Sequence, residues 1–336
     1  MSLKVAIIGT GYIGQVHARA VRNTPGLVLN AAVNNQPDLL AAFCADYNVP
    51  YQYVSVDDLL KSGNLDIMVV ATPNYLHAPF AIAALKAGIP VMVEKPMALN
   101  SSEAEKMTET SQKSGAALMV AHCWRFDEEV YWLSQQAAAG KMGKIIRSKG
   151  YGVHVNWGPQ GWFTQKQFAG GGALVDMGIH AIDTARFLVG DPQPVSVYAR
   201  ISTYYKDFDV DDTGVILITW DNGVTSYIES GWWQPHTDGP EASTQLYGTS
   251  GFGQVFPTRL ELPNTVEQKI EVIDPGFTFP RKEHCPQEMY DSQMAYFADC
   301  IRVGQTPVPG AREGLINIKI VDAAYKSALI GEVVTL

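Results

Sequence analysis

The sequence contains few of the residues that mark whole classes of protein. Only four of its 336 residues are cysteines, and no two of them are spaced as CxxC: Cys44, Cys123, Cys285 and Cys300. This usage argues against a disulfide framework and is typical of a reducing compartment. No HExxH or paired His/Cys spacing occurs either, so we expect no metal site.

Long apolar runs and basic clusters are also missing. Segments such as IMVVA and VILITW are far shorter than the roughly 20 residues that cross a bilayer. The opening MSLKVAIIGTGYIG enters a strand pattern without the features of a secretion signal, so we expect a cytoplasmic protein. The formal net charge of −9 would repel nucleic acid and anionic membranes. We therefore expect neither as a partner.

Two successive patterns are present, and the length also suggests two domains. From residue 3 to about 121, short apolar runs alternate with amphipathic helical segments, which predicts a parallel sheet covered on both faces. From residue 143 onward longer β-type runs dominate, and WDNGVT contains the Asn-Gly of a hairpin. Two helices close the chain, near 287–303 and 312–330. We expect an α/β domain over 1–121 and a mostly antiparallel α+β domain over 122–336.

A glycine-rich loop follows the first apolar run. GTGYIG lies between a predicted strand and helix, as the dinucleotide fingerprint requires. Its first glycine would allow the tight turn, its second would let the backbone approach a pyrophosphate, and its third would let helix and strand pack closely. The helix N-terminus would then face the phosphates. A ligand-free turn is the structural alternative. The predicted phosphate-binding residues are Gly9, Gly11, Tyr12, Ile13 and Gly14.

The residues after the second apolar run bear on the choice of cofactor. Asn34 and Asn35 stand where an acidic residue commonly holds the ribose 2′-hydroxyl of NAD. An asparagine can hydrogen-bond that hydroxyl without a charge. No lysine or arginine lies between Arg22 and Lys61, so a 2′-phosphate would lack a local cation. We expect NAD in preference to NADP, with Asn34 as a contact.

Two further motifs end neighbouring predicted strands. These are ATPNYLH, residues 71–77, and EKP, residues 94–96. Ligands of open α/β sheets bind beyond the carboxyl ends of the strands, so both motifs should border the cofactor. The structural alternatives are a surface turn for EKP and helix capping for His77. The predicted cofactor contacts are Thr72, Pro73, Asn74, His77, Glu94 and Lys95.

GGGALVDMGIH, residues 170–180, places Asp176 four positions before His180. On a helix starting near Gly172, their Cβ atoms would be about 5–6 Å apart. A carboxylate that accepts the N–H of an imidazole fixes its tautomer and leaves the other nitrogen able to take a proton. The glycines would let this helix start close to a substrate or to neighbouring backbone. A solvated helix face is the structural alternative.

Together, GTGYIG, ATPNYLH, EKPMAL and GGGALVDMGIHAID resemble the Gfo/Idh/MocA family of oxidoreductases. The resemblance extends to WRF at 124–126 and to YKSALIGEVV. It implies a Rossmann domain with a doubly wound sheet, followed by an α+β domain whose large open sheet often mediates homodimers or homotetramers. It also implies site roles: Lys95 beside the nicotinamide, Asp176 as orienting carboxylate and His180 as the proton-transferring histidine. Pro96 would shape the lysine turn and permit a cis bond, whereas Arg125 is interpreted as structural.

These observations predict an NAD(P)-dependent dehydrogenase that acts on a carbinol of a sugar, polyol, cyclitol or related small molecule. His180 would take the hydroxyl proton, Lys95 would hydrogen-bond the oxygen, and Asp176 would hold the imidazole. Two other functions stay open: redox-neutral cleavage of a glycoside, and a non-catalytic NAD-binding regulator, which would not need the lysine and histidine together. The predicted substrate contacts are Lys95, Asp176, His180, Trp162 and His154, although the last two could serve packing alone.

Overall fold

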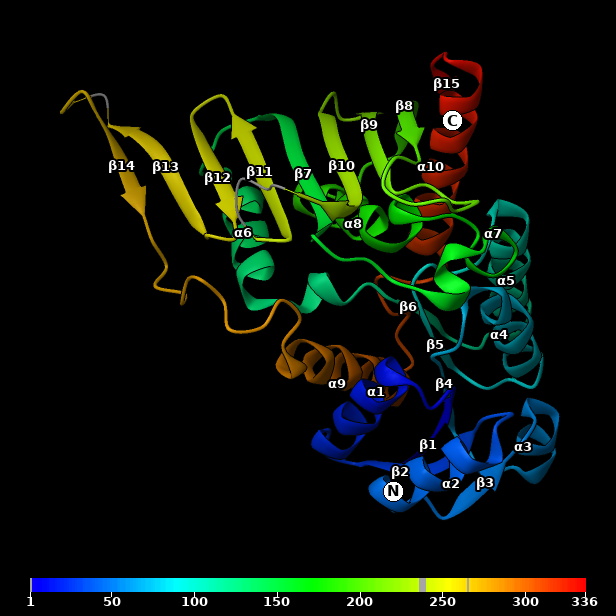
Figure 1. Cartoon of the computed structure of the whole chain (residues 1–336). Helices are drawn as coiled ribbons and strands as arrows, with labels where there is room; N and C mark the ends of the chain where they lie inside the picture. The colour runs from blue at the N-terminus through cyan, green and yellow to red at the C-terminus, as the bar shows by residue number, and fades with distance from the viewer. Residues whose placement is uncertain (1, 236–239, 265) are drawn as a thin grey trace. The chain divides into compact units, whose positions relative to one another are not determined.

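The computed structural model describes residues 2–235, 240–264 and 266–336 (Figure 1). The chain forms two compact units, Met1–Cys123 with Pro286–Ile318, and Trp124–Cys285 with Lys319–Leu336. This division differs from a single boundary at 121/122, because the helix α9 (Gln287–Val303) packs on α1 (Tyr12–Asn23) and so belongs with the N-terminal part of the chain. The sequence pattern cannot show such a return of the chain.

The first unit is built on a six-stranded parallel sheet in the order β3-β2-β1-β4-β5-β6. Strands β4, β5 and β6 are buried along their whole length, which explains their uninterrupted apolar sequence. The strand order changes direction beside β1, and this confirms the doubly wound Rossmann arrangement. The strands are β1 (Leu3–Ile8), β2 (Leu27–Val33), β3 (Tyr51–Tyr53), β4 (Ile67–Val70), β5 (Val91–Glu94) and β6 (Leu118–Ala121).

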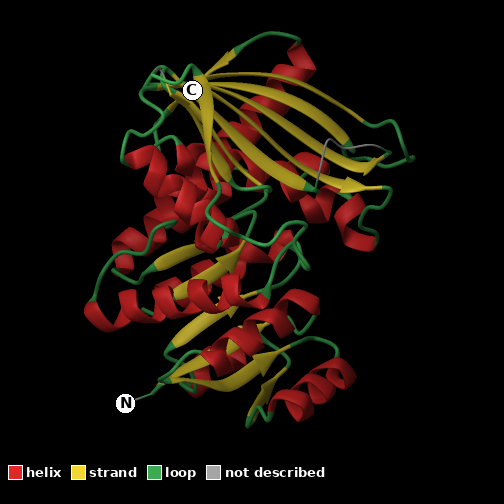
Figure 2. Ribbon diagram, turned by 90° about the vertical axis from the view of Figure 1, so that its left-hand side faces the viewer, coloured by secondary structure: helices red, strands yellow, loops and turns green. Residues whose placement is uncertain are grey.

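Helices lie on both faces of this parallel sheet (Figure 2). The side chain of Ser55 caps the N-terminus of α3, and that of Asn100 caps α5. Glycines in the left-handed conformation, Gly63 and Gly115, end the same two helices. The remaining helical segments of this region are α2 (Pro37–Tyr47), α3 (Val56–Ser62), η1 (Asn74–Leu76), α4 (His77–Lys86) and α5 (Ser101–Ser114).

The second unit contains a nine-stranded sheet in the order β14-β13-β12-β11-β7-β10-β9-β8-β15. Only the central pair β7 and β10 is parallel, so the expected, mostly antiparallel open sheet is confirmed. The expected hairpin joins β9 to β10 through Asn222 and Gly223, whose φ is +84°. The strands are β7 (Ile145–Val155), β8 (Pro194–Ser202), β9 (Thr213–Trp220), β10 (Thr225–Gln234), β11 (Ala242–Gly248), β12 (Gly251–Val255), β13 (Arg259–Asn264), β14 (Lys269–Ile273) and β15 (Val334–Thr335).

One face of this sheet is covered by helices and the other is open. The helices α6 and α8 contact strands β7, β10, β11 and β12 (Figure 1). Burial alternates along β9, where Val215 and Leu217 are exposed between buried neighbours. None of the described helices is long and apolar enough to cross a membrane. The helical segments are η2 (Cys123–Phe126), α6 (Glu128–Ala138), η3 (Gly161–Thr164), α7 (Lys166–Ala169), η4 (Leu174–Gly178), α8 (Ile179–Leu188) and α10 (Ala311–Ile330).

Candidate functional site

The glycines of the β1–α1 loop serve two different purposes. Gly9 has a φ of +93°, and a Cβ there would overlap the carbonyl oxygen of Ala71. A Cβ on Gly14 would overlap the carbonyl oxygen of Gly9. Gly11 has a φ of −73°, and no described atom lies within 4 Å of where its Cβ would be. Packing against the protein therefore excludes a side chain at Gly9 and Gly14. At Gly11 the space is open, because no described atom lies within 4 Å of a Cβ there.

The helix α1 begins at this open space. Its N-cap residue is Gly11, so no side chain satisfies the N–H groups of the first turn. These N–H groups and the helix dipole favour an anion such as a phosphate. Tyr12 is 79% exposed and Ile13 is partly buried, so neither closes the approach. The loop fits the pyrophosphate of a dinucleotide.

Asn34 follows β2, and both the nitrogen and the oxygen of its side-chain amide form hydrogen bonds. Its Nδ2 donates to Thr10 Oγ1 at 2.5 Å, and its Oδ1 accepts the backbone N–H of Gln36 at 2.9 Å. An amide oxygen has two lone pairs, so one of them can still accept from a ribose hydroxyl. The geometry is compatible with the predicted contact, and the asparagine brings no positive charge.

His77 joins the loops that follow β4 and β5. Its imidazole is fully buried, with Nδ1 2.7 Å from the carbonyl oxygen of Pro96 and Nε2 2.8 Å from that of Thr72. Burial lowers the pKa of His77, although both backbone contacts act in the opposite direction. The hydroxyl of Thr72 is buried without a hydrogen-bond partner among the described residues, and a buried polar group of this kind calls for an additional partner. Together with the space at Gly11, it indicates that this edge of the sheet accommodates a polar ligand.

The turn after β5 holds Lys95 next to a buried carboxylate. Glu94 Oε1 lies 2.7 Å from His17 Nε2, and Glu94 Oε2 accepts the backbone N–H of Lys95 at 3.1 Å. Burial alone would raise the pKa of Glu94, but the hydrogen bond and charge of His17, with the charge of Lys95, lower it. The Lys95–Pro96 bond is cis, as the turn permits. Our sequence interpretation missed His17; its signal is the position three residues after Gly14 on α1.

Two of the three glycines before Asp176, Gly171 and Gly172, are explained by neighbouring parts of the second unit. The carboxylate of Asp211 accepts the backbone N–H groups of Gly172 and Leu174, each at 2.8 Å, and the hydroxyl of Tyr325 at 2.6 Å. A Cβ on Gly172 would overlap the Asp211 carbonyl oxygen, and one on Gly171 would overlap the Tyr325 hydroxyl. Burial raises the pKa of Asp211. The close approach is therefore to protein backbone and side chain.

The segment that carries Asp176 is not a regular α-helix. Leu174–Gly178 is a π-helical turn, and α8 follows it. A π turn is wider than an α turn and often occurs at functional sites. Asp176 Oδ2 accepts the indole N–H of Trp232 at 3.1 Å and lies 3.5 Å from His154 Nε2. The structure thus brings together two predicted substrate contacts, Asp176 and His154.

His154 is flanked by two carboxylates. Its Nδ1 lies 3.4 Å from Glu241 Oε2, and its ring stacks on Trp157 with centroids 3.6 Å apart. Burial would lower the pKa of His154, but Asp176 and Glu241 raise it. Glu241 also accepts from the indole of Trp157 at 2.6 Å, and its pKa falls to about 2 because these hydrogen bonds outweigh burial. Our sequence interpretation missed Glu241, because no motif surrounds it.

Two other predicted residues of the second unit, His180 and Trp162, stack on aromatic side chains. His180 is 7% exposed, and its ring stacks on Trp124 with centroids 4.8 Å apart. Trp162 stacks on Phe163 in η3, at 3.8 Å between centroids.

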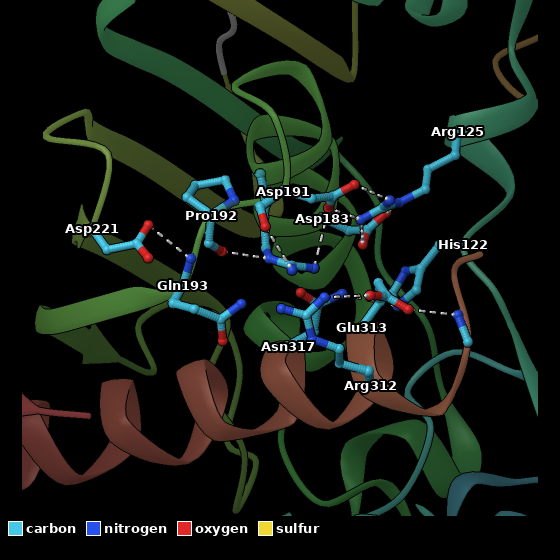
Figure 3. A network of polar contacts seen from close by, with 12 residues as sticks. His122, Arg125, Asp183, Asp191, Pro192, Gln193, Asp221, Arg312, Glu313 and Asn317 are labelled. Carbon is cyan, nitrogen blue, oxygen red and sulfur yellow. Dashed lines mark hydrogen bonds and ion pairs between the residues drawn. The ribbon is translucent and has the colours of Figure 1, made fainter.

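Arg125 forms the ion-pair network drawn in Figure 3. Its guanidinium contacts both carboxylate oxygens of Asp183, at 2.7 and 2.8 Å, and both of Asp191, at 2.9 and 2.8 Å. Burial would lower the pKa of Arg125, but the two carboxylates raise it. Asp183 is only 1% exposed, so the polar side of α8 is not a solvated face. The contacts support the structural interpretation of Arg125.

The fold and the open glycine loop define a dinucleotide-binding protein with a second unit built on an open sheet. Comparison with known protein families agrees with this description and adds the class of enzyme. Residues 3–122 match the family described as an oxidoreductase family with an NAD-binding Rossmann fold, and residues 132–252 match the Gfo/Idh/MocA C-terminal domain. The chain belongs to the Gfo/Idh/MocA family.

Similar proteins cover almost the whole chain. D-glucoside 3-dehydrogenase of Escherichia coli is 26% identical over 99% of this chain and 97% of its own length. D-xylose 1-dehydrogenase (NADP(+)) 2 of Haloferax volcanii is 27% identical over 91% of each chain. A levoglucosan dehydrogenase, solved in complex with NADH and L-sorbose, superimposes with a TM-score of 0.90 over 100% of this chain and 99% of that chain. Its identity of 24% shows the shared fold alone.

Proposed function

We propose that the protein transfers a hydride between a carbinol carbon of a sugar, polyol or cyclitol and the nicotinamide of NAD(P). The observation that carries this proposal lies in the first unit. Lys95 follows β5 at the carboxyl edge of the sheet, the edge at which the Gly11 loop also lies. Ligands of this fold bind along that edge. A cation there suits an oxygen that gains negative charge during hydride transfer.

The proposed catalytic residues are Lys95, His180 and Asp176. During oxidation the carbinol C–H bond breaks with its electron pair, and the bound nicotinamide supplies the hydride acceptor. His180 takes the hydroxyl proton, so the product is a carbonyl compound, while Lys95 hydrogen-bonds the reacting oxygen. Asp176, whose carboxylate also contacts Trp232 and His154, is proposed to orient the imidazole of His180.

The proposal on the cofactor is NAD in preference to NADP. Its support is the neutral Asn34 after β2 and the lack of any lysine or arginine between Arg22 and Lys61. Separate titrations with NADH and NADPH, read by nicotinamide fluorescence, test the preference. Tighter binding of NADPH would contradict it. The proposed cofactor contacts are Gly9, Gly11, Tyr12, Ile13, Gly14, Asn34, Thr72, Pro73, Asn74, His77, Glu94 and Lys95.

The test of catalysis combines a substrate panel with two variants. Cyclitols, aldoses, polyols and glycosides are screened by the absorbance of the reduced cofactor. Lys95→Ala and His180→Ala should each lower kcat by about 10²-fold or more, as loss of a general acid–base group does. Lys113→Ala is the matched control, because this lysine pairs with Glu109 on the exposed surface of α5. Near-normal turnover in both variants, with cofactor still bound, would contradict the assignment.

The panel also separates the alternative functions. Glycoside cleavage without net NADH would indicate the redox-neutral reaction, and cofactor binding without any turnover would indicate a regulator. Neither alternative is favoured, because the relatives named above are dehydrogenases.

We also propose a homodimer or homotetramer that assembles through the open face of the nine-stranded sheet. Its support is a set of exposed apolar residues on the strands of this sheet: Ile146, Val215, Leu217, Ile270 and Val272. Sedimentation velocity tests this proposal, and a monomer at micromolar concentration would contradict it. A cytoplasmic location remains a prediction, to which the four free cysteines are suited.

A further inference from the structure

The second unit contains a cavity that the proposed reaction does not use. Its volume is about 410 Å³, which lies within the range of small-molecule sites. We call it the Glu241 pocket, after one of its lining residues; the others that matter here are Phe256, Phe279, Arg281 and His284.

The charge of the Glu241 pocket comes from Glu241. The low pKa of Glu241, about 2, keeps its carboxylate ionised at neutral pH. Arg281 is neutralised from within the protein, because its guanidinium lies 2.5 Å from Asp127 and 3.5 Å from Glu129. The guanidinium carbon of Arg281 also lies over the ring of Phe256, 4.4 Å from its centroid. The pocket should therefore repel sugar phosphates and sugar acids.

The remaining lining suits an uncharged polyhydroxyl ring. The Nε2 atom of His284 is buried without a hydrogen-bond partner among the described residues. Burial lowers the pKa of His284 to about 4, so the imidazole is neutral at pH 7 and can accept from or donate to a hydroxyl. Phe256 and Phe279 add apolar ring surfaces. A carboxylate, a neutral imidazole and aromatic rings together match the alternating C–H and O–H groups of a pyranose.

Two chains of contact join the Glu241 pocket to the proposed catalytic residues of the same unit. Glu241 contacts His154, which in turn contacts Asp176. His284 meets Trp124 edge to face, with centroids 5.3 Å apart, and Trp124 stacks on His180. The pocket is thus one residue away from Asp176 on one side and from His180 on the other.

We propose that the Glu241 pocket binds a second, uncharged sugar ring, so that the preferred substrate is a disaccharide or comparable glycoside. This inference rests on the proposed function, because the first ring would be the one oxidised beside Asp176 and His180. The pocket determines the class of substrate, because it should bind a ring with uncharged hydroxyl groups and repel a ring that carries an anionic group.

The kinetic test compares glucose with cellobiose, gentiobiose and maltose, and with glucose 6-phosphate as the anionic probe. For at least one disaccharide, kcat/KM should exceed that for glucose by about tenfold, which corresponds to one ordinary binding contact. Phe279→Ala should remove this advantage, and it should fold because Phe279 is 47% exposed. Tyr204→Ala is the matched control, since Tyr204 is 74% exposed and does not line the pocket.

Several outcomes would overturn the inference. These are glucose preferred over every disaccharide, an equal loss for glucose and disaccharide in Phe279→Ala, and glucose 6-phosphate as the best substrate. Calorimetric titration of the same sugars keeps the test separate from catalysis. Binding of a disaccharide that Phe279→Ala weakens would support the pocket even if no turnover occurred, in which case only the proposed function fails. Undetectable binding of every disaccharide, or binding that Phe279→Ala leaves unchanged, would refute the pocket.

Discussion

Replacement of His17 should destabilise the protein and disturb Lys95, although His17 is not proposed to touch the substrate. In His17→Ala the buried Glu94 carboxylate loses its 2.7 Å partner. Leaving a buried charged acceptor unsatisfied costs about 3 kcal/mol. For a unit of this size that energy corresponds to a fall in Tm of roughly 6–12 °C. The same change should raise the pKa of Glu94, because burial then acts without its main opposing contact.

The sign of the pH dependence follows from the depressed pKa of Glu94. A carboxyl group with a lowered folded-state pKa stabilises the protein above its unfolded value, here 4.5, and this contribution is lost as the pH falls through the folded value. Because the pKa of Glu94 is raised in His17→Ala, the stability difference from wild type should be full at neutral pH, shrink as the pH falls through that raised value and vanish below the lowered value of wild type.

The assay is thermal unfolding from pH 3 to 8, combined with kcat at neutral pH. His17→Gln is the matched variant, because a glutamine amide can still donate to the carboxylate; it should recover most of the Tm and of kcat. If alanine and glutamine variants unfold at the same temperature as wild type at neutral pH, the carboxylate does not depend on His17. A loss of kcat that glutamine fails to restore, with normal Tm, would instead make His17 a direct participant.

Three further predictions concern other parts of the site. Gly11→Ala should fold normally, since no described atom lies within 4 Å of its Cβ, yet weaken NADH binding by about tenfold. Gly9→Ala should unfold at a lower temperature because of its φ of +93°. The same Tm and the same NADH affinity in both variants would contradict this. Tyr325→Phe should lower the free energy of unfolding by about 1–3 kcal/mol, because a buried carboxylate loses its 2.6 Å donor; denaturant titration measures it, and an unchanged midpoint refutes it. The raised pKa of His154 means that its carboxylate contacts stabilise the protein fully below pH 6.5 and that this contribution is lost as pH rises through the folded value; an NMR titration midpoint below 6.5 would reverse that sign.

The sequence predicted those parts of the site that depend on short motifs. GTGYIG needs only a strand, a tight turn and a helix, so the φ of +93° at Gly9 and the overlap of a Gly14 Cβ with the Gly9 carbonyl oxygen follow from local sterics. The return of α9 to α1 was not predictable, because it depends on packing between segments about 270 residues apart. The same holds for Glu241, whose partners lie on β7 and in the loop after it.

The π turn at Asp176 shows where pattern alone fails. The spacing of Asp176 and His180 predicted a regular helix from Gly172, because apolar periodicity there suits an α-helix. The helix start is instead set by Asp211, which binds the N–H groups of Gly172 and Leu174 from a distant loop. That contact fixes the backbone independently of the local pattern.

The two units fix their functional turns by the same physical device. In each, a buried carboxylate accepts a backbone N–H of the turn and contacts a polar group of a distant aromatic side chain. Glu94 accepts the N–H of Lys95 and contacts Nε2 of His17, and Asp211 accepts the N–H of Gly172 and the hydroxyl of Tyr325. Burying the charge is costly unless every partner is in place, so the turn has few alternative positions. A loss of activity on replacing Glu94 or Asp211 would therefore indicate that the turn has moved. Only variants of Lys95 and His180 test the groups that are proposed to act on the substrate itself.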